Sequence, residues 1–199
     1  MRNAEHTRMR IRRQAAELFN IKGYAGASLS DIMQATALEK GGIYHHFGSK
    51  EQLALEAFDY AADVVRQRFL QAQNGKHDSR ALLVAFVDLF RSYIERPPLR
   101  GGCPVLNTAI ESDDTHPVLA ARARSVVDEW RTFVTGVVEQ GKQRGEVAAT
   151  VDGDALATLM IATLEGGLML TKLYDDGVHL HRAAAYLTEY LERVVQPTS

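Results

Sequence analysis

The 199-residue chain is 46% hydrophobic and 24% charged, as expected of a soluble globular protein with one or two domains. Its single cysteine excludes an internal disulfide framework and a cysteine-rich zinc site. The formal net charge of −2 is unevenly distributed, with +4 on residues 1–50 and −6 on the remainder. The first segment would attract a polyanion that the remainder repels, unless the unevenness is a chance feature of a solvated surface.

Two stretches bear on the location of the protein. The N-terminal stretch MRNAEHTRMRIRRQAAELF is amphipathic and lacks the continuous apolar run of a signal peptide. The most apolar stretch, LATLMIATLEGGLMLT, is interrupted by Glu165 and two glycines and is short for a bilayer span. We therefore expect a soluble cytoplasmic protein with no membrane partner.

Helical periodicity dominates the first 50 residues. A first helix is predicted to end at Gly23, and its apolar residues follow the spacing of one buried face. These residues are Ile11, Ala15, Leu18 and Phe19. Ser28 or Ser30 can cap a second, short helix. Its inward residues are expected to be Ile32, Met33 and Ala35.

The remaining chain is predicted to be helical as well. A turn near Ala37 precedes a third short helix that ends at about Phe47, and Ser49 and Gln52 have the capping-box spacing that opens a long fourth helix. Further helices are expected at about 79–95, 104–112, 117–145, 152–175 and 178–195. Extended strand alternation is missing from the sequence, so the chain is predicted to be all-α.

The stretch EKGGIYHHFGSKEQL, residues 39–53, contains the third helix and has the composition of a helix that lies in a DNA major groove. Two glycines cost the helix roughly 1 kcal/mol each against alanine, which is acceptable where the backbone approaches another molecule closely. Ile43 and Phe47 are four residues apart and are expected to face inward. The residues left for the outer surface or for charge beside it are Lys40, Gly41, Gly42, Tyr44, His45 and Lys50.

The paired histidines also raise the question of a metal site. Adjacent helical residues point about 100° apart, so His45 and His46 are poorly placed to bind one ion together. We favour an arrangement in which His46 packs among the helices while His45 faces solvent or DNA. No metal and no cofactor is therefore expected.

These residues resemble the tetracycline-repressor (TetR/AcrR) family of bacterial transcription regulators. The motifs fall in family order and spacing within roughly the first 60 residues, and beyond them only length and the helical pattern agree. They are Ala15-Ala16-Glu17-Leu18-Phe19, Gly23-Tyr24, Asp31-Ile32, Lys40-Gly41, Tyr44, Phe47 and Ser49-Lys50-Glu51 followed by Leu53.

The resemblance implies a three-helix helix-turn-helix domain at 1–50 and a ligand-binding, dimerising bundle of about six helices at 51–199. It places DNA contacts at Lys40, Tyr44 and Lys50, with Ser28 as a phosphate contact. The sequence departs from the family pattern at three positions, which affects the expected operator sequence rather than the DNA-binding role. Alanine replaces a common turn glycine at Ala37, an acid replaces a small polar residue at Glu39, and Gly42 replaces a frequent threonine.

One small helix-turn-helix touches few base pairs, so a homodimer is expected to read two half-sites of a palindromic double-stranded operator about 34–36 Å apart. An apolar stripe near the C-terminus is a candidate for pairing, broadened by Gly166 and Gly167, although an internal core is the alternative. The stripe consists of Leu156, Met160, Leu164, Leu168 and Leu170, continued by Leu187, Tyr190, Leu191 and Val194.

A small-molecule inducer pocket is predicted where apolar residues meet a few polar groups. The residues proposed to line it are Phe90, Cys103, Asn107, Glu111 and Trp130. Pro104 places the Cys103 thiol at a helix start, where it would be either a redox or electrophile sensor or a small buried core residue.

The function that best fits the sequence is a ligand-responsive, sequence-specific repressor that a small molecule releases from its operator. Two other classes remain open: a small helical enzyme with Cys103 as nucleophile, and a non-specific nucleic-acid binder. The first lacks a recognisable catalytic motif, so no catalytic residue is predicted. The second would show a broader basic surface and little preference between sequences.

Overall fold

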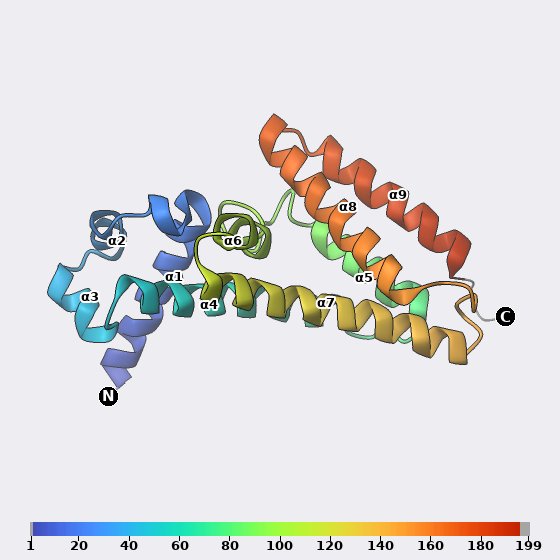
Figure 1. Ribbon diagram of the computed structural model, residues 1–199, viewed down its shortest axis with the longest axis horizontal. Helices are drawn as coiled ribbons and strands as arrows, with labels where there is room; N and C mark the ends of the chain where they lie inside the picture. The colour runs from blue at the N-terminus through green and yellow to red at the C-terminus, as the bar shows by residue number, and fades with distance from the viewer. Residues whose placement is uncertain (1, 196–199) are drawn as a thin grey trace. The chain divides into compact units, whose positions relative to one another are not determined.

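The structure of the protein, a computed structural model, describes residues 2–195 and is all-α in that range (Figure 1). The prediction of the fold class is therefore confirmed. The helices are α1 (Arg2–Gly26), α2 (Leu29–Thr36), α3 (Lys40–His46), α4 (Lys50–Gln73), α5 (Ser79–Arg91), α6 (Pro104–Ser112), α7 (Pro117–Gln143), α8 (Gly153–Tyr174) and α9 (Val178–Val194).

The chain divides into two compact units. The first contains residues 1–65 and 98–124, and the second contains residues 66–97 and 125–199. The long helices α4 and α7 each contribute residues to both units. The predicted domain boundary at residue 50 describes the helix-turn-helix segment alone, and it stays a prediction.

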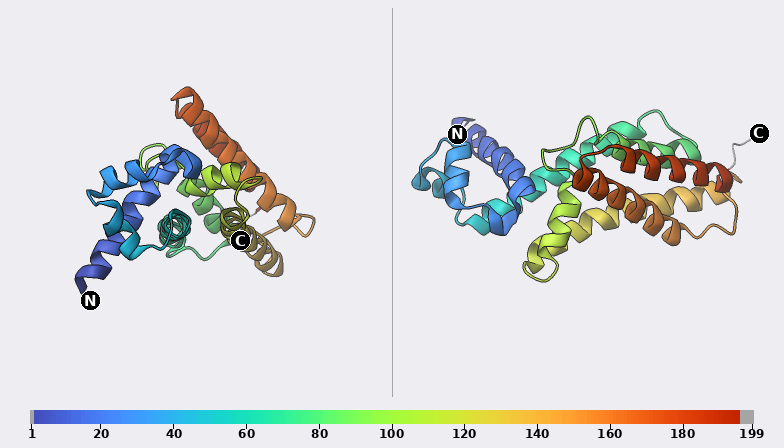
Figure 2. Two further views of the ribbon diagram at one scale, coloured as in Figure 1. Left: turned by 60° about the vertical axis from the view of Figure 1, so that its left-hand side comes forward. Right: turned by 90° about the horizontal axis from the view of Figure 1, so that it is seen from above.

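In the first unit, the helices α1, α2 and α3 form the N-terminal trio that Figure 2 shows from two further sides. They share a core with the start of α4. Its fully buried side chains include Ile11, Ile32, Ile43, Phe47 and Leu53. Ala35, which was expected to face inward, is exposed, because Ile32 and Thr36 supply the buried face of α2.

Helix α1 does not simply end at Gly23. This glycine has a φ of 76° and a ψ of 165°, which breaks the helix, and one further helical turn follows to Gly26. A positive φ of this kind suits glycine because it has no Cβ. The break turns Tyr24 and Ala25 toward α6, where they meet Glu111.

The turn between α2 and α3 contains an alanine in the left-handed conformation. Ala37 has a φ of 53° and a ψ of 38°, and its N–H donates to the carbonyl of Met33 to close α2. Ala37 therefore adopts the conformation that a glycine would adopt more readily, because a side chain is disfavoured in it.

In the second unit, α8 packs along α9, and α5 packs against both (Figures 1 and 2). Gly167 allows the α8–α9 approach, because a Cβ at this position would lie 2.8 Å from the Cβ of Ala183. Helix α5 ends at Arg91 rather than near 95, and residues 92–95 form turns. Phe86, Phe90 and Trp130 form a buried aromatic cluster in this unit.

Most of the predicted pairing stripe is wrong, because only Leu170, Tyr190 and Val194 of its members are half-buried rather than buried. Leu156, Met160, Leu164 and Leu168 are buried within the protomer, and so are Leu187 and Leu191 on α9, which is the internal core that the sequence left as an alternative. By length and composition alone, α8 is long and apolar enough to cross a bilayer. A helix buried in a protein core meets the same two criteria. The exposed large apolar residues of α8 are Leu159, Met169, Leu173 and Tyr174.

We predict that Ala37→Gly stabilises the protein by about 0.5 kcal/mol, because the relief of left-handed strain exceeds the added backbone entropy of glycine. Ala37 is exposed, so the substitution removes no packing. The measurement is the free energy of urea unfolding. The matched control is Ala35→Gly, which lies inside α2 and should instead destabilise by about 1 kcal/mol. A lower stability for Ala37→Gly would contradict the assigned turn.

Candidate nucleic-acid interface and pocket

Helix α3 presents one face to the core and the other to solvent. Ile43 and Phe47 are each 1% exposed and fix the helix from behind. Lys40, Gly41 and His45 are exposed, as predicted for an outer face. The remaining outer candidates, Gly42 and Tyr44, are half-buried, and the Lys40 ammonium lies 5.8 Å from the centroid of the Tyr44 ring.

The two glycines of α3 differ in their surroundings. A Cβ on Gly41 would meet no atom within 4 Å, whereas one on Gly42 would contact the Leu38 side chain at 3.7 Å. The backbone at Gly41 is therefore bare on its outer side, and another molecule can approach it closely. The imidazoles of His45 and His46 meet edge to face, with 5.3 Å between their ring centroids.

Ser28, rather than Ser30, caps α2. Its hydroxyl oxygen accepts a bond from the Asp31 N–H at 3.0 Å and its O–H donates to the Asp31 carboxylate at 2.7 Å. The Lys22 ammonium beside this carboxylate, 2.6 Å away, and then the Ser28 hydroxyl hold the pKa of Asp31 well below its ordinary value. The hydroxyl predicted to bind a DNA phosphate thus already has an acceptor, and the Ser28 contact stays a prediction.

Two arginines of α1 hold the helix-turn-helix in place. The Arg8 guanidinium lies 4.6 Å from the centroid of the Phe47 ring and donates to the carbonyl of His46 and to the Glu56 carboxylate. Arg10 donates to the carbonyl of Thr36, at the end of α2, at 2.8 Å. Sequence reasoning counted both only as positive charge, because their partners lie 26 to 48 residues away.

Lys50, at the first position of α4, is held by Tyr24. Its ammonium donates to the Tyr24 carbonyl at 2.6 Å and lies 4.5 Å from the centroid of the Tyr24 ring. Burial, and after it the Glu51 carboxylate, raises the pKa of the Tyr24 phenol. A DNA phosphate would have to share Lys50 with this site, so its role as a DNA contact stays a prediction.

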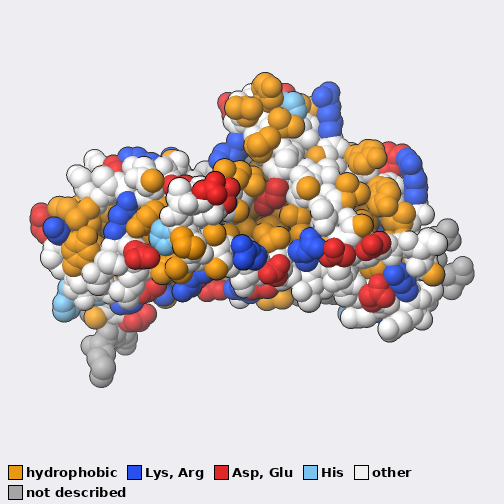
Figure 3. All heavy atoms as spheres, in the orientation of Figure 1, with side chains coloured by type: hydrophobic (Ala, Val, Ile, Leu, Met, Phe, Trp, Pro, Cys, Tyr) orange, Lys and Arg blue, Asp and Glu red, His pale blue; other side chains and the backbone are white. Residues whose placement is uncertain are grey.

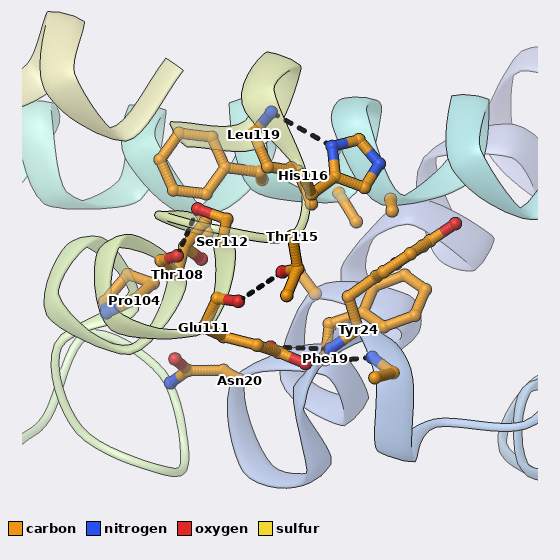
Figure 4. A pocket seen from close by; sticks show the side chains of 16 residues that line it. Phe19, Asn20, Tyr24, Pro104, Thr108, Glu111, Ser112, Thr115, His116 and Leu119 are labelled. Atoms are coloured by element: carbon orange, nitrogen blue, oxygen red, sulfur yellow. Dashed lines mark hydrogen bonds between the residues drawn. The ribbon is translucent and has the colours of Figure 1, made fainter. Parts of the chain in front are cut away.

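A cavity of about 240 Å³ lies within the first unit, between α1, α4, α6 and the start of α7 (Figure 4). Its walls combine aromatic rings and alanines with a small polar rim. The aromatic residues are Phe19, Tyr24 and Phe58, and the alanines are Ala16, Ala25, Ala54, Ala57 and Ala61. The rim includes Asn20, Thr108, Glu111, Ser112, Thr115 and His116.

The Glu111 carboxylate joins α6 to the broken end of α1. It accepts a bond from the Tyr24 N–H at 2.8 Å and one from the Ala25 N–H at 2.9 Å, as Figure 4 shows. A Cβ on Gly23 would lie 2.6 Å from the nearer carboxylate oxygen, so a side chain at this position would displace the carboxylate. Beside this contact, the Asn107 amide donates to the carbonyl of Asn20 at 3.1 Å and to its side-chain oxygen at 2.9 Å.

Comparison with known proteins decides the family. The family described as "Bacterial regulatory proteins, tetR family" matches residues 11–57, and "Tetracyclin repressor-like, C-terminal domain" matches residues 80–187. The chain belongs to the TetR family. A solved TetR transcriptional regulator from Chloroflexus aurantiacus is 54% identical, with a TM-score of 0.97 over 100% of both chains.

Curated relatives agree with this assignment to the TetR family. A helix-turn-helix-type transcriptional regulator of Mycobacterium tuberculosis is 31% identical over 81% of this chain and 82% of its own length. The transcriptional repressor AcnR of Corynebacterium glutamicum is 28% identical over 81% of this chain and 79% of its own length. The prediction of a DNA-binding transcription regulator is thereby confirmed, and these relatives give the alternatives of a Cys103 enzyme and a non-specific binder no support.

The predicted ligand residues of this TetR-family protein fall into different surroundings. Glu111 lines the cavity in the first unit, and Asn107 lies beside it on α6. Cys103 occupies the N-cap position of α6, makes no capping hydrogen bond with its side chain, and is 1% exposed. Phe90 and Trp130 pack against each other in the core of the second unit, with 5.6 Å between their ring centroids. A ligand site formed from all five residues stays a prediction.

We predict that Arg8→Ala lowers the stability of this TetR-family protein by about 1 kcal/mol, because the carbonyl of His46 and the Glu56 carboxylate lose a partly exposed charged donor. The measurement is again urea unfolding. Arg8→Lys is the matched control: it keeps the charge but cannot donate in two directions from a planar group, so it should recover only part of the loss. Equal stability of Arg8→Ala and the unmodified protein would contradict the assigned role.

Proposed function

We propose that this TetR-family regulator binds a palindromic double-stranded operator as a homodimer and represses transcription until a small molecule releases it. The observation that carries the DNA contact is the outer face of α3, where the bare backbone at Gly41 lies between the exposed side chains of Lys40 and His45. Repression is supported by the name of the Corynebacterium relative, a transcriptional repressor. A cytoplasmic location follows from the proposed partner.

The proposed contacts divide into two kinds. Lys40 supplies a positive charge for a phosphate, and the Tyr44 hydroxyl can donate to a phosphate oxygen or a base edge. His45, Gly41 and Gly42 lie on the same short helix, and the glycines allow the backbone itself to come close. Ser28 and Lys50 complete the proposed set, and each would exchange a present hydrogen-bond partner for the DNA.

Dimerisation is proposed through the apolar residues that α8 and α9 leave uncovered. Met169 and Leu173 lie four residues apart on α8 and are 47% and 71% exposed, and Tyr186 on α9 is 62% exposed. Hydrophobic side chains gather where α8 ends and α9 begins, at the top of Figure 3. Burial of such residues against a second copy would bring two recognition helices onto one palindrome.

The DNA contacts are tested by operator binding. The operator is first selected from random duplexes, and affinity is then measured by fluorescence anisotropy across salt concentrations. Tyr44→Ala should weaken operator binding about tenfold or more, since each specific contact contributes roughly 1–3 kcal/mol. Lys40→Ala should weaken all sequences similarly and reduce the salt slope by about 2 per dimer, one phosphate contact from each protomer.

Lys76→Ala is the matched control for the lysine, because Lys76 lies in the loop between α4 and α5. It should leave both affinity and slope unchanged. If folded Tyr44→Ala and Lys40→Ala proteins bind the selected operator as tightly as the unmodified protein, α3 is not the reading helix.

The dimer surface is tested by light scattering after size exclusion. The double substitution Met169→Glu and Leu173→Glu should weaken dimerisation at least 100-fold, since two apolar side chains lose burial and two charges enter the interface. Leu70→Glu, at an apolar position on α4 that is 53% exposed, is the control and should remain dimeric. An undisturbed dimer in the double variant would place the interface elsewhere.

A further inference from the structure

The cavity beside the broken end of α1 has an unusual balance of charge. Of the 16 described residues that line it, Glu111 is the one carboxylate, and none is lysine or arginine (Figure 4). The two oxygens of Glu111 are held by backbone N–H groups rather than by a basic side chain. Backbone donors satisfy the lone pairs of a carboxylate but do not neutralise its charge.

The basic groups closest to Glu111 already have partners of their own. The Nδ1 of His116 accepts a bond from the N–H of Leu119 at 3.3 Å. Its Nε2 lies 3.6 Å from the Glu51 carboxylate, which adds further negative charge near the rim. The Lys50 ammonium donates to the Tyr24 carbonyl, whereas Glu111 accepts a bond from the Tyr24 N–H.

The walls favour a particular kind of molecule. The rings of Phe19 and Phe58 line the same cavity as Glu111, and aromatic faces attract cations at close range. The Tyr24 ring also lines the cavity and already has the Lys50 ammonium 4.5 Å from its centroid. Alanines leave the remaining wall smooth and apolar. A volume of about 240 Å³ is below the 300–1,000 Å³ of sites for drug-sized ligands, so the occupant is compact.

We infer that this cavity binds a compact organic ammonium ion, whose cationic head lies at Glu111 and whose apolar body lies against Phe19 and Phe58. The inference rests on the proposed ligand-responsive function and assigns the ligand a site in the first unit, apart from the Phe90–Trp130 cluster. A neutral molecule of the same shape gains only the apolar contact. A carboxylate of the same shape is repelled by Glu111.

The site is positioned to act on DNA binding. A cation at Glu111 competes with the N–H groups of Tyr24 and Ala25 for the same oxygens, and so loosens the hold of α6 on the end of α1. The other end of α1 carries Arg8 and Arg10, which hold the ends of α3 and α2. Binding of the cation therefore lowers operator affinity, and by reciprocity operator DNA lowers affinity for the cation by the same factor.

The test uses three molecules that share one ring and differ in charge: benzylammonium, benzyl alcohol and benzoate. Isothermal titration of the intact dimer, without DNA, gives the affinity of each. We expect benzylammonium to bind at least tenfold more tightly than benzyl alcohol and benzoate to bind least. Equal affinities, a preference for benzoate or no binding of the cation would overturn the inference.

Two substitutions locate the binding. Glu111→Gln keeps the size of the side chain and removes its charge, so the cation should lose its advantage over the alcohol. Asp114→Asn is the matched control, because Asp114 is exposed in the loop after α6 and does not line the cavity. It should keep the tenfold preference. Thr108→Phe fills the cavity and should abolish binding of all three molecules, which keeps the test decisive if the Gln variant does not fold.

Operator binding is then measured with and without benzylammonium. A reduction of at least fivefold, absent in Thr108→Phe, supports the coupling, while cation binding with unchanged operator affinity overturns it. The two proposals fail separately. Cation binding in the absence of DNA supports the site even where α3 is not the reading helix, and an operator that is bound tightly by a protein with no affinity for the cation leaves only the DNA proposal standing.

Discussion

The backbone at the broken end of α1 is bound to α6 by one carboxylate, Glu111. The break at Gly23 leaves the N–H groups of Tyr24 and Ala25 without helical acceptors, and Glu111 accepts both. Leaving a buried N–H without an acceptor lowers the stability of the fold by more than a formed hydrogen bond raises it. A Cβ on Gly23 would overlap the carboxylate, so the glycine that breaks the helix also leaves room for the acceptor. A hydrogen bond between Asn107 and Asn20 is a second link between α1 and α6.

The recognition helix is too short to be stable by itself, since α3 has only seven residues and two of them are glycines. Tertiary contacts hold α3 in place: Ile43 and Phe47 pack in the core, and Arg8 donates to the carbonyl of His46 at the C-terminal end of the helix. This arrangement separates the two demands on the helix. The inner face carries the stability, and the outer face is free to be small, polar and bare where another molecule must approach.

The sequence was sufficient for those features that depend on local patterns. Periodicity correctly predicted that Ile43 and Phe47 face inward and that α6 runs from Pro104 to Ser112. Both features are determined by residues close to one another in the sequence. Periodicity failed for Met160 and Leu164, since α8 is apolar on more than one side and periodicity cannot say which side meets the same protomer. Arg8 and Glu111 escaped prediction as structural links because their partners are 38 to 87 residues away. Of the predicted ligand residues, only the polar Glu111 lies at the cavity, whereas Phe90 and Trp130 were chosen for an aromatic character that core packing explains equally well.

The burial of the one cysteine has a practical consequence. Cys103 lies at the start of α6 and is 1% exposed, so a thiol reagent can reach it only while that turn is displaced. The rate at which Cys103 of the unmodified protein reacts with such a reagent therefore reports how often the start of α6 opens. Because Cys103 is shielded, a cysteine introduced at an exposed position would react much faster with a dye or spin label. Such a label can therefore be attached without first removing Cys103.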